Sequence, residues 1–387
     1  MDEILYVGFY ADPDDNIEKR NCSLAAVNLM NYIAGAVSES RRVTIVSPSW
    51  TLSGTGRYGS NKRPLSANIS LQTCPTIGFS SIPSKALVYL ISQVWLFFYL
   101  LGHASRRTTV MVYHSPWLVL PVVLSKYLKR FRLVLQVCEI YQDASATGFL
   151  MRHAERWMIA EADRYLLSTA ILNSRVNRKN KPFSVCGGVY RPEKAMCVPS
   201  DDGRVHLVYS GIIDQVKRGA FTAVRVAEHL DDTYRTHIIG FGRQEDIAAL
   251  RALIEVVNQK KGGVAVTYEG IKLGAEFNRF LQRCHIGYST QSPGRDFNAS
   301  SFPAKIFSYL TNRLRVVSIS TEAIRASEAS SVIHFYYHDD PGEIADVVRG
   351  VDLTSVVREA DLVGRLHEDF VRDISRLVKF DDIAGVA

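Results

Sequence analysis

The sequence predicts an α/β protein built from two doubly wound parallel-sheet domains, and three observations indicate this class. Short apolar runs of strand length alternate with longer amphipathic segments along the chain. The short runs are apolar nearly throughout, which is typical of parallel strands buried on both faces. The alternation stops at a polar stretch near residue 200 and then starts again, and 387 residues suit two domains better than one.

The first half opens with a strand in "EILYVGFY", a polar loop, a helix in "CSLAAVNLMNYIAGAV" and a second strand in "RRVTIVSP". Strand, helix and strand follow in "TTVMVYH", "WLVLPVVLSKYLKRF" and "RLVLQVCEIY". A long amphipathic helix and a short strand are then predicted in "FLMRHAERWMIAEADRYLLSTA". These elements predict a first domain over residues 1–199.

The second half restarts after "VPSDDGR" with strands in "VHLVYSG", "RTHIIGFG", "AVTYEG", "HIGYST" and "LRVVSIS". Helical segments separate these strands, so a second doubly wound domain is expected over residues 200–350. Residues 351–387 are expected to form a C-terminal helical segment that packs back on the first domain.

The segment Ala86–Gly102 is almost wholly apolar and is flanked by Lys85, Arg106 and Arg107. It is at the lower limit of membrane-spanning length. Three interpretations are open: a buried crossover helix, a helix at a membrane surface, or a span. We favour the crossover helix, because a span would pull the first sheet apart.

The charge and the cysteines narrow the functional classes. The net charge is +7, but the basic residues are dispersed and form no stripe interleaved with aromatic residues, so no nucleic-acid partner is expected. The six cysteines have neither zinc-type spacing nor a preceding signal peptide, which indicates reduced thiols and a cytoplasmic location.

Ligands of open α/β sheets bind beyond the carboxyl ends of the strands, and in the second half these ends carry glycines and cations. Glycine lets the backbone approach a diphosphate, and lysine and arginine neutralise its charge. The alternative is that the glycines only turn the chain and the cations are solvated. The candidates for a nucleotide cradle are Gly211, Lys217, Arg218, Gly240, Gly242, Tyr268, Gly270 and, in the loop "SSFPAK", Ser300, Ser301, Phe302 and Lys305.

The order of "YSG…VKRG", "HIIGFG", "VTYEG", "HIGYSTQSP" and "FPAKIFSYLTNRLRVVS" resembles the donor half of the retaining, family-4-like glycosyltransferases of the GT-B fold. In the first half, "MVYHSP", "QVCEIYQD" and "VCGGVYRP" extend the resemblance to roughly residues 3–350. The resemblance implies two Rossmann-like domains facing a cleft, with an acceptor on the first and a nucleotide-sugar donor on the second.

Two acids that the resemblance leads us to expect are missing. Related enzymes commonly carry a glutamate three residues after the lysine of this loop, where it holds the donor ribose, and some carry another eight residues earlier. Ser308 and Ser300 stand at these positions, and Ile212 replaces an arginine that often follows the glycine of the "SG" segment. A serine hydroxyl binds a ribose hydroxyl less strongly than a carboxylate does.

On the acceptor side, the resemblance places His114 and Glu139 where polar residues meet the reacting sugar. Glu139 is the preferred catalytic candidate, because an acid after a largely apolar strand is costly to bury without a partner or a task, and Asp143 is its nearby alternative. A backbone carbonyl could equally satisfy His114. The first loop of the family corresponds to Arg20 and Asn21, which are the acceptor-binding candidates.

These features predict a metal-independent hexosyltransferase that acts on a lipid-linked or polysaccharide acceptor at the cytoplasmic face of the inner membrane. The expected partners are a UDP or GDP sugar, the acceptor and a peripheral membrane contact, with neither metal nor cofactor. The missing glutamates leave a second hypothesis open, a non-catalytic GT-B module that acts as a scaffold in glycan assembly. A GT-B epimerase or hydrolase is less favoured, because no acid constellation is visible in the second half.

Overall fold

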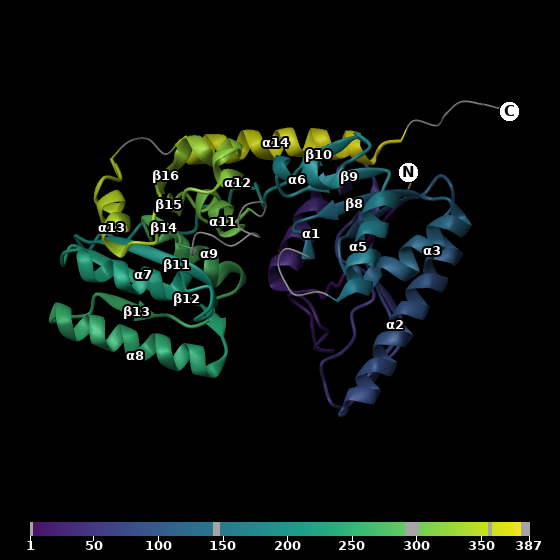
Figure 1. Ribbon diagram of the computed structural model, residues 1–387, viewed down its shortest axis with the longest axis horizontal. Coiled ribbons are helices and arrows are strands. Elements are labelled where there is room, and N and C mark those ends of the chain that lie inside the picture. Colours follow the sequence, from purple (N-terminus) through teal and green to yellow (C-terminus); the bar gives the residue numbers. More distant parts are fainter. Residues whose placement is uncertain (1–2, 142–147, 291–301, 355–357, 381–387) are drawn as a thin grey trace. The chain divides into compact units, whose positions relative to one another are not determined.

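The computed structural model describes residues 3–141, 148–290, 302–354 and 358–380 (Figure 1). The chain divides into a first compact unit, Met1–Gly187 with Glu368–Ala387, and a second unit, Gly188–His367. The division falls ahead of the expected residue 199, because the segment after Gly187 is bonded to the second unit. Glu193 N donates to Thr311 O at 3.0 Å, for example.

The first unit contains an eight-stranded sheet in the order β10-β9-β8-β7-β1-β2-β5-β4, parallel except for β4. Its strands are β1 (Glu3–Val7), β2 (Arg42–Ser47), β4 (Asn61–Pro64), β5 (Ile69–Thr73), β7 (Thr109–Tyr113), β8 (Arg132–Val137), β9 (Arg164–Leu167) and β10 (Phe183–Val185). The sequence does not predict β4, β5 or the small antiparallel ribbon of β3 (Arg57–Tyr58) and β6 (Thr76–Ile77). These strands are short or polar, so their pattern is weak.

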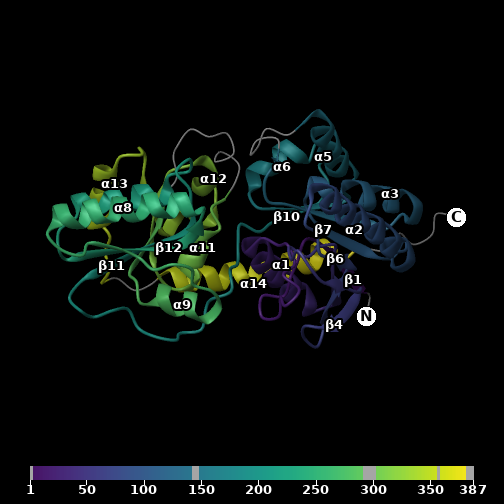
Figure 2. The ribbon, with the colours of Figure 1, turned by 90° about the horizontal axis from the view of Figure 1, so that it is seen from below.

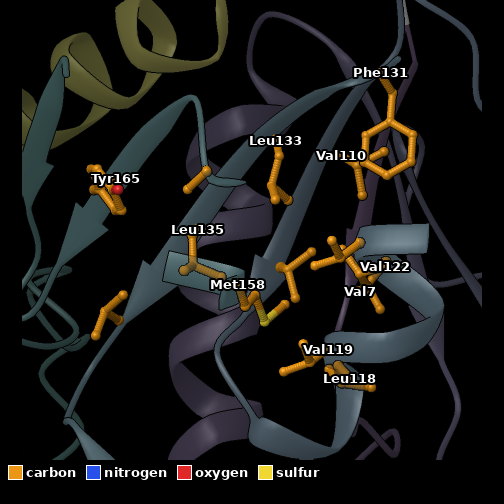
Figure 3. Packing of buried hydrophobic residues seen from close by; sticks show 14 of the residues in the cluster. Val7, Val110, Leu118, Val119, Val122, Phe131, Leu133, Leu135, Met158 and Tyr165 are labelled. Atoms are coloured by element: carbon orange, nitrogen blue, oxygen red, sulfur yellow. The ribbon is translucent and has the colours of Figure 1, made fainter. Parts of the chain in front are cut away.

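Helices cover both faces of this sheet. They are α1 (Leu24–Ser38), α2 (Ile82–His103), the 3-10 turn η1 (Pro116–Leu118), α3 (Val119–Lys129), α5 (Phe149–Glu161) and α6 (Ala170–Val176). Figure 3 shows the core on one face, where Leu133 and Leu135 of β8 lie near Val122 of α3 and Met158 of α5. Each of these four side chains is fully buried.

One face of α2 belongs to the same core, through Leu96 and Leu100. Ser81 caps the start of the helix, and its side chain accepts a hydrogen bond from Ser84 N. By length and composition alone α2 could cross a membrane, and only 22% of its most apolar window is buried. The expected buried crossover helix is therefore found on one face of α2 only, and the opposite face is exposed.

The second unit contains a six-stranded parallel sheet in the order β13-β12-β11-β14-β15-β16. Its strands are β11 (Val205–Ile213), β12 (Tyr234–Gly242), β13 (Val266–Tyr268), β14 (Ile286–Ser289), β15 (Arg315–Ile319) and β16 (Ile333–Tyr336). The helices are α7 (Gly219–Val226), η2 (Ala227–His229), α8 (Gln244–Lys261), α9 (Gly274–Gln282), α11 (Lys305–Thr311), α12 (Glu322–Arg325), η3 (Glu328–Val332) and α13 (Pro341–Arg349). Figure 2 shows α8 and α9 on opposite sides of β11 and β12.

The helix α14 (Arg358–Val378) begins in the second unit and belongs to the first unit from Glu368 on. There the ring of Phe370 stacks on Tyr32 of α1, with 5.2 Å between the ring centroids. Arg164 donates to the carbonyl oxygens of Leu377 and Lys379 at 2.8 and 2.7 Å. The last turn of α14 and Lys379 after it are thus bonded to β9 of the first sheet.

Candidate functional site

At the carboxyl edge of the second sheet, the paired ends of β11 and β12 leave no room for side chains at two positions. Gly211 and Gly240 are paired in register, and a Cβ atom on Gly240 would lie 1.8 Å from Gly211 O. A Cβ atom on Gly242 would lie 2.2 Å from Ile213 O. The sequence predicts these glycines just after the strands, but the structure has them within the strands. Glycine is required at 240 and 242 because a Cβ atom there would collide with a carbonyl oxygen of β11.

Gly270 does lie in a loop, directly after β13. Its φ of 72° falls in the left-handed region, which glycine adopts without strain. The loop is tied to the neighbouring strand, because Gly240 N donates to Gly270 O at 3.0 Å. The structure therefore brings Gly211, Gly240 and Gly270 together at one edge of the sheet.

Lys305, the first residue of α11, extends over this edge. Its Nζ atom would lie 3.0 Å from a Cβ atom on Gly211 and is 3.8 Å from the ring centroid of Tyr209. No ion pair joins Lys305 to a carboxylate in the part of the chain that the structure describes. Burial lowers the pKa of Lys305 to about 7, and the positive charge of Lys217 adds to the shift.

Lys217 and Arg218 follow β11 in a turn organised by Asp214. The Asp214 Oδ1 atom accepts hydrogen bonds from Val216 N at 2.6 Å and Lys217 N at 3.1 Å. Arg218 has a φ of 59° and immediately precedes α7. Both side chains are exposed, and the effect of Lys217 on the pKa of Lys305 shows that these two cations share one region.

The first residue of α7, Gly219, packs against the residues at this edge of the sheet. A Cβ atom on Gly219 would lie 2.6 Å from Thr290 O and 2.8 Å from the Tyr209 hydroxyl oxygen. The Thr290 hydroxyl donates to Gly219 O at 2.7 Å. The helix start is therefore packed tightly against the ends of β11 and β14.

The position of α11 is set by Tyr309, which is fully buried. Its hydroxyl accepts from Ser210 N at 2.8 Å and donates to Tyr288 O at 3.1 Å. Ser308 is half-buried next to it, and its hydroxyl has no hydrogen bond to another described residue. Phe302 is buried and stacks on Phe307 at 5.0 Å, which anchors the segment that leads into α11. Ser300 and Ser301 lie outside the described residues.

Tyr268 has structural contacts. Its hydroxyl donates to Gly240 O at 2.9 Å, and the guanidinium of Arg251 in α8 lies 5.4 Å from its ring centroid. These contacts fix β13 against β12 and α8. The tyrosine that does lie at the site is Tyr209, two residues before Gly211, whose ring contacts Lys305. The sequence analysis does not identify it.

In the first unit, the carboxyl edge of the sheet holds a buried histidine and a buried carboxylate. The His114 Nε2 atom lies 3.6 Å from Glu155 Oε1, and both side chains are 1% exposed. Neither ring nitrogen of His114 meets a hydrogen-bond partner at full bonding distance and angle among the described residues, although the Glu139 backbone is near enough to act on the ring. Burial lowers the pKa of His114 to about 4, against an opposing effect of the Glu139 backbone.

Glu155 is a residue that the sequence interpretation did not single out. Its Oε1 atom also accepts from Tyr141 N at 2.8 Å, so it fixes the segment that follows β8. The sequence pattern that could have identified it is an acidic residue on the apolar, core-facing side of the amphipathic helix α5.

Glu139 follows β8 and is only half-buried. Burial raises the pKa of Tyr141 to about 12, and the Glu139 carboxylate adds to the shift. Glu155 is therefore the more deeply buried acid, and Glu139 is a half-buried carboxylate near Tyr141. Asp143 lies outside the described residues.

Arg20 is a buried structural residue. Its guanidinium donates to Glu18 at 2.5 Å, to Ser49 O and, at 2.8 Å, to Cys74 O. Asn21 N donates to Trp50 O at 2.8 Å. Because its guanidinium N–H groups already donate hydrogen bonds within the protein, the Arg20 side chain does not fit the acceptor-binding role expected from the sequence.

The described residues contain no group of three or more His, Cys, Asp or Glu side chains that could hold a metal ion. The site that the structure assembles in the second unit contains lysine, glycine and backbone groups.

No family model matches the sequence, and no curated protein matches it. Solved structures do match in fold. OtsA in its apo form is 13% identical with a TM-score of 0.67, over 98% of this chain and 97% of that one. An α,α-trehalose-phosphate synthase (UDP-forming) from Burkholderia xenovorans, in complex with glucose-6-phosphate, is 11% identical with a TM-score of 0.67, over 98% of both chains.

Anabaena HepE in complex with UDP is 10% identical with a TM-score of 0.64, over 97% of this chain and 98% of that one. Since these structures are GT-B glycosyltransferases matched over nearly their whole length, the chain has the GT-B fold with its two Rossmann-like domains. This confirms the fold class, and the family-4 likeness stays a prediction.

Proposed function

We propose that the protein is a glycosyltransferase that moves a hexose, with retention, from a nucleotide-diphosphate sugar to a lipid-linked or polysaccharide acceptor in cell-surface glycan synthesis. The observation that carries this proposal is Lys305, an ammonium group over the Gly211 backbone with no ion-pair partner among the described residues. A diphosphate supplies the negative charge that such a group lacks.

The structural neighbours support a nucleotide-sugar donor. One solved structure of an E. coli trehalose-6-phosphate enzyme holds UDP-2-fluoro glucose, and HepE holds UDP. The donor base and sugar of the present protein are not implied by these likenesses, because the sequence identities are low.

In the proposed reaction, the charge that develops on the departing diphosphate is stabilised by Lys305 and Lys217. Preorganised cations and backbone amides lower the energy of such a transition state without a metal ion. Ser308, one turn after Lys305 on α11, is proposed to bind the donor ribose. The acceptor is assigned to the first unit, where Glu139 orients the attacking hydroxyl.

The test is a nucleotide panel of UDP, GDP and their hexose derivatives, read as a shift in Tm and as a Kd from calorimetry. We expect one base to raise the Tm, and Lys305→Ala and Lys217→Ala each to weaken that binding by about 1.5 to 3 kcal/mol, the range for hydrogen bonds to charged groups. Lys260→Ala is the matched control, because Lys260 pairs with Glu228 in the same unit, away from the cradle. Equal affinity of Lys305→Ala and the parent protein would show that the cradle is wrongly assigned.

A non-catalytic scaffold is the second candidate, and the observation that favours it is Ser308 in place of the glutamate implied by the family resemblance. The two candidates differ in turnover. A scaffold would release no nucleotide from any donor in the panel, with or without acceptor lipids, whereas a transferase would release it in an acceptor-dependent reaction.

A further inference from the structure

The first unit exposes an apolar surface on two neighbouring helices, α2 and α3. Both helices pack on the same face of the sheet, so their outward sides lie next to each other (Figures 1 and 2). The exposed large side chains include Leu87, Leu90, Val94 and Phe98 on α2, and Trp117, Leu120, Leu124 and Leu128 on η1 and α3. We call these eight residues the apolar face.

The spacing of these residues shows that each helix is apolar on both sides. On α2, Val88, Ser92, Leu96 and Leu100 are buried, and the exposed apolar positions follow the opposite side at intervals of three or four residues. Phe98 is 63% and Leu128 is 65% exposed. A contiguous surface of this kind is rare on a protein that meets only water and marks a site of interaction.

The two helices run parallel to each other. Tyr89 on α2 donates to Trp117 O at 3.2 Å, and Ser125 on α3 donates to Phe97 O at 3.3 Å, so both helices advance in the same direction. Their carboxyl ends therefore lie at the same edge of the unit. Four basic residues follow or end the helices there: Arg106, Arg107, Lys129 and Arg130.

The charge around the apolar face is of one sign. No Asp or Glu occurs between Glu39 and Glu139, a stretch that contains all of α2 and α3, and its charged residues are lysines and arginines. The four basic residues at the helix ends, together with Lys85 in the first turn of α2, form no ion pair with another described residue. The surface thus combines apolar side chains with uncompensated positive charge.

We infer that the apolar face docks side-on into the interface of an anionic phospholipid bilayer. An interfacial helix buries its apolar side at the level of the head groups, while flanking lysines and arginines bind the anionic lipids. A second copy of the chain is a poor occupant, because it would bring the same positive charge to the contact. A span is a poor arrangement as well, since it would remove Leu96 and Leu100 from the core.

The inference assigns the peripheral membrane contact expected from the sequence to a surface of two helices. It does not depend on sugar transfer, because its test measures lipid binding alone.

The experiment is flotation of the full chain with vesicles of phosphatidylcholine, with and without phosphatidylglycerol. We expect flotation with the anionic vesicles at low salt, release at high salt, and little binding to phosphatidylcholine alone. The variant Leu90→Gln/Phe98→Gln/Leu124→Gln should partition at least about tenfold more weakly, because it loses three apolar side chains that would enter the bilayer. The control Val256→Gln/Val264→Gln/Ile271→Gln changes three exposed apolar residues of the second unit and should float like the parent protein.

Circular dichroism and Tm are measured for both triple variants, and Arg106→Gln/Arg107→Gln provides a second test that leaves the apolar face intact. This charge variant should need less salt for release. Equal binding of the Leu90/Phe98/Leu124 variant and the parent, or equal binding to neutral and anionic vesicles, would overturn the inference. Two other results would also overturn it. One is a parent protein that is dimeric in solution and becomes monomeric in the Leu90/Phe98/Leu124 variant, with flotation unchanged. The other is vesicle-bound protein that carbonate does not extract.

Discussion

The Lys305 Nζ atom lies 3.8 Å from the centroid of the Tyr209 ring, at the carboxyl edge of the second sheet. The ring attracts the ammonium ion through its negative face, but it does not neutralise the charge. Partial burial and the positive charge of Lys217 lower the pKa of Lys305 to about 7, which makes the lysine responsive to an anion.

The first prediction concerns protons taken up on donor binding. A bound diphosphate favours the ammonium form of Lys305 and so raises its pKa from about 7. Binding at pH 7.5 should therefore take up a fraction of a proton, and affinity should fall as the pH rises above about 7. A UDP or GDP hexose is the suitable probe, because its phosphates do not titrate near neutrality.

The measurement is calorimetry in two buffers of different ionisation enthalpy. Lys305→Met should remove most of the uptake, and Lys260→Met should keep it. Identical binding heats in the two buffers for the parent protein would contradict the assignment of Lys305 to the diphosphate.

The second prediction concerns the ribose. Ser308→Glu should tighten nucleotide binding severalfold, because a hydrogen bond to a charged acceptor is stronger than one to a hydroxyl. Ser308→Gln is the control of equal size without the charge and should bind like the parent protein or slightly better. If Ser308→Glu folds normally and loses nucleotide binding, the pocket has been reshaped and Ser308 does not face the ribose.

The third prediction separates the two acids of the first unit. Glu139→Gln should lower turnover by about 10²-fold, the usual scale for a positioned acid or base, and leave nucleotide affinity near that of the parent protein. Glu155→Gln keeps an oxygen for Tyr141 N and should lower stability more than turnover. Steady-state rates and urea denaturation of both variants provide the comparison. Normal turnover of Glu139→Gln with a large loss in Glu155→Gln would move the catalytic role to Glu155 and His114.

The fourth prediction tests the spacing of the strands. Gly240→Ala should lower the free energy of unfolding by at least about 2 kcal/mol, because the new methyl group meets Gly211 O and the two strands must separate. Gly263→Ala is the control, since a Cβ atom there meets nothing within 4 Å. Denaturation curves of the two variants are compared with that of the parent. Equal stability of Gly240→Ala and Gly263→Ala would show that β11 and β12 are not in this register.

Much of the candidate site could be predicted from the sequence because it follows from local order. The carboxyl ends of parallel strands meet at one edge of a sheet, so glycines and lysines just beyond several strands are gathered there whatever the details of packing. Gly211, Gly270, Lys217 and Lys305 were predicted on this ground, and the structure brings them to one edge. Gly240 was predicted as well, but the structure assigns it to the contact between the strands.

Other parts of the site depend on contacts between distant segments. Burial of Glu155 follows from the packing of α5 on the first sheet, and the donors of Arg20 are occupied by carbonyl groups far along the chain. The sequence pattern around these residues shows a charged group near apolar ones, which a surface position would show equally well. Sequence reasoning therefore placed the buried acid at Glu139 instead of Glu155 and read Arg20 as a ligand-binding residue.

The sequence by itself determined the class of the fold, since strand and helix periodicity and two rounds of alternation depend only on neighbours along the chain. It also determined that α2 would be apolar and that no acid would accompany it. Only the tertiary structure decided that Lys305 lies over Tyr209 and Gly211, and that half of α2 stays uncovered beside α3. Both facts depend on the order of the strands and on how many helices fit on one face of a sheet. Packing between residues that are remote in sequence decides both.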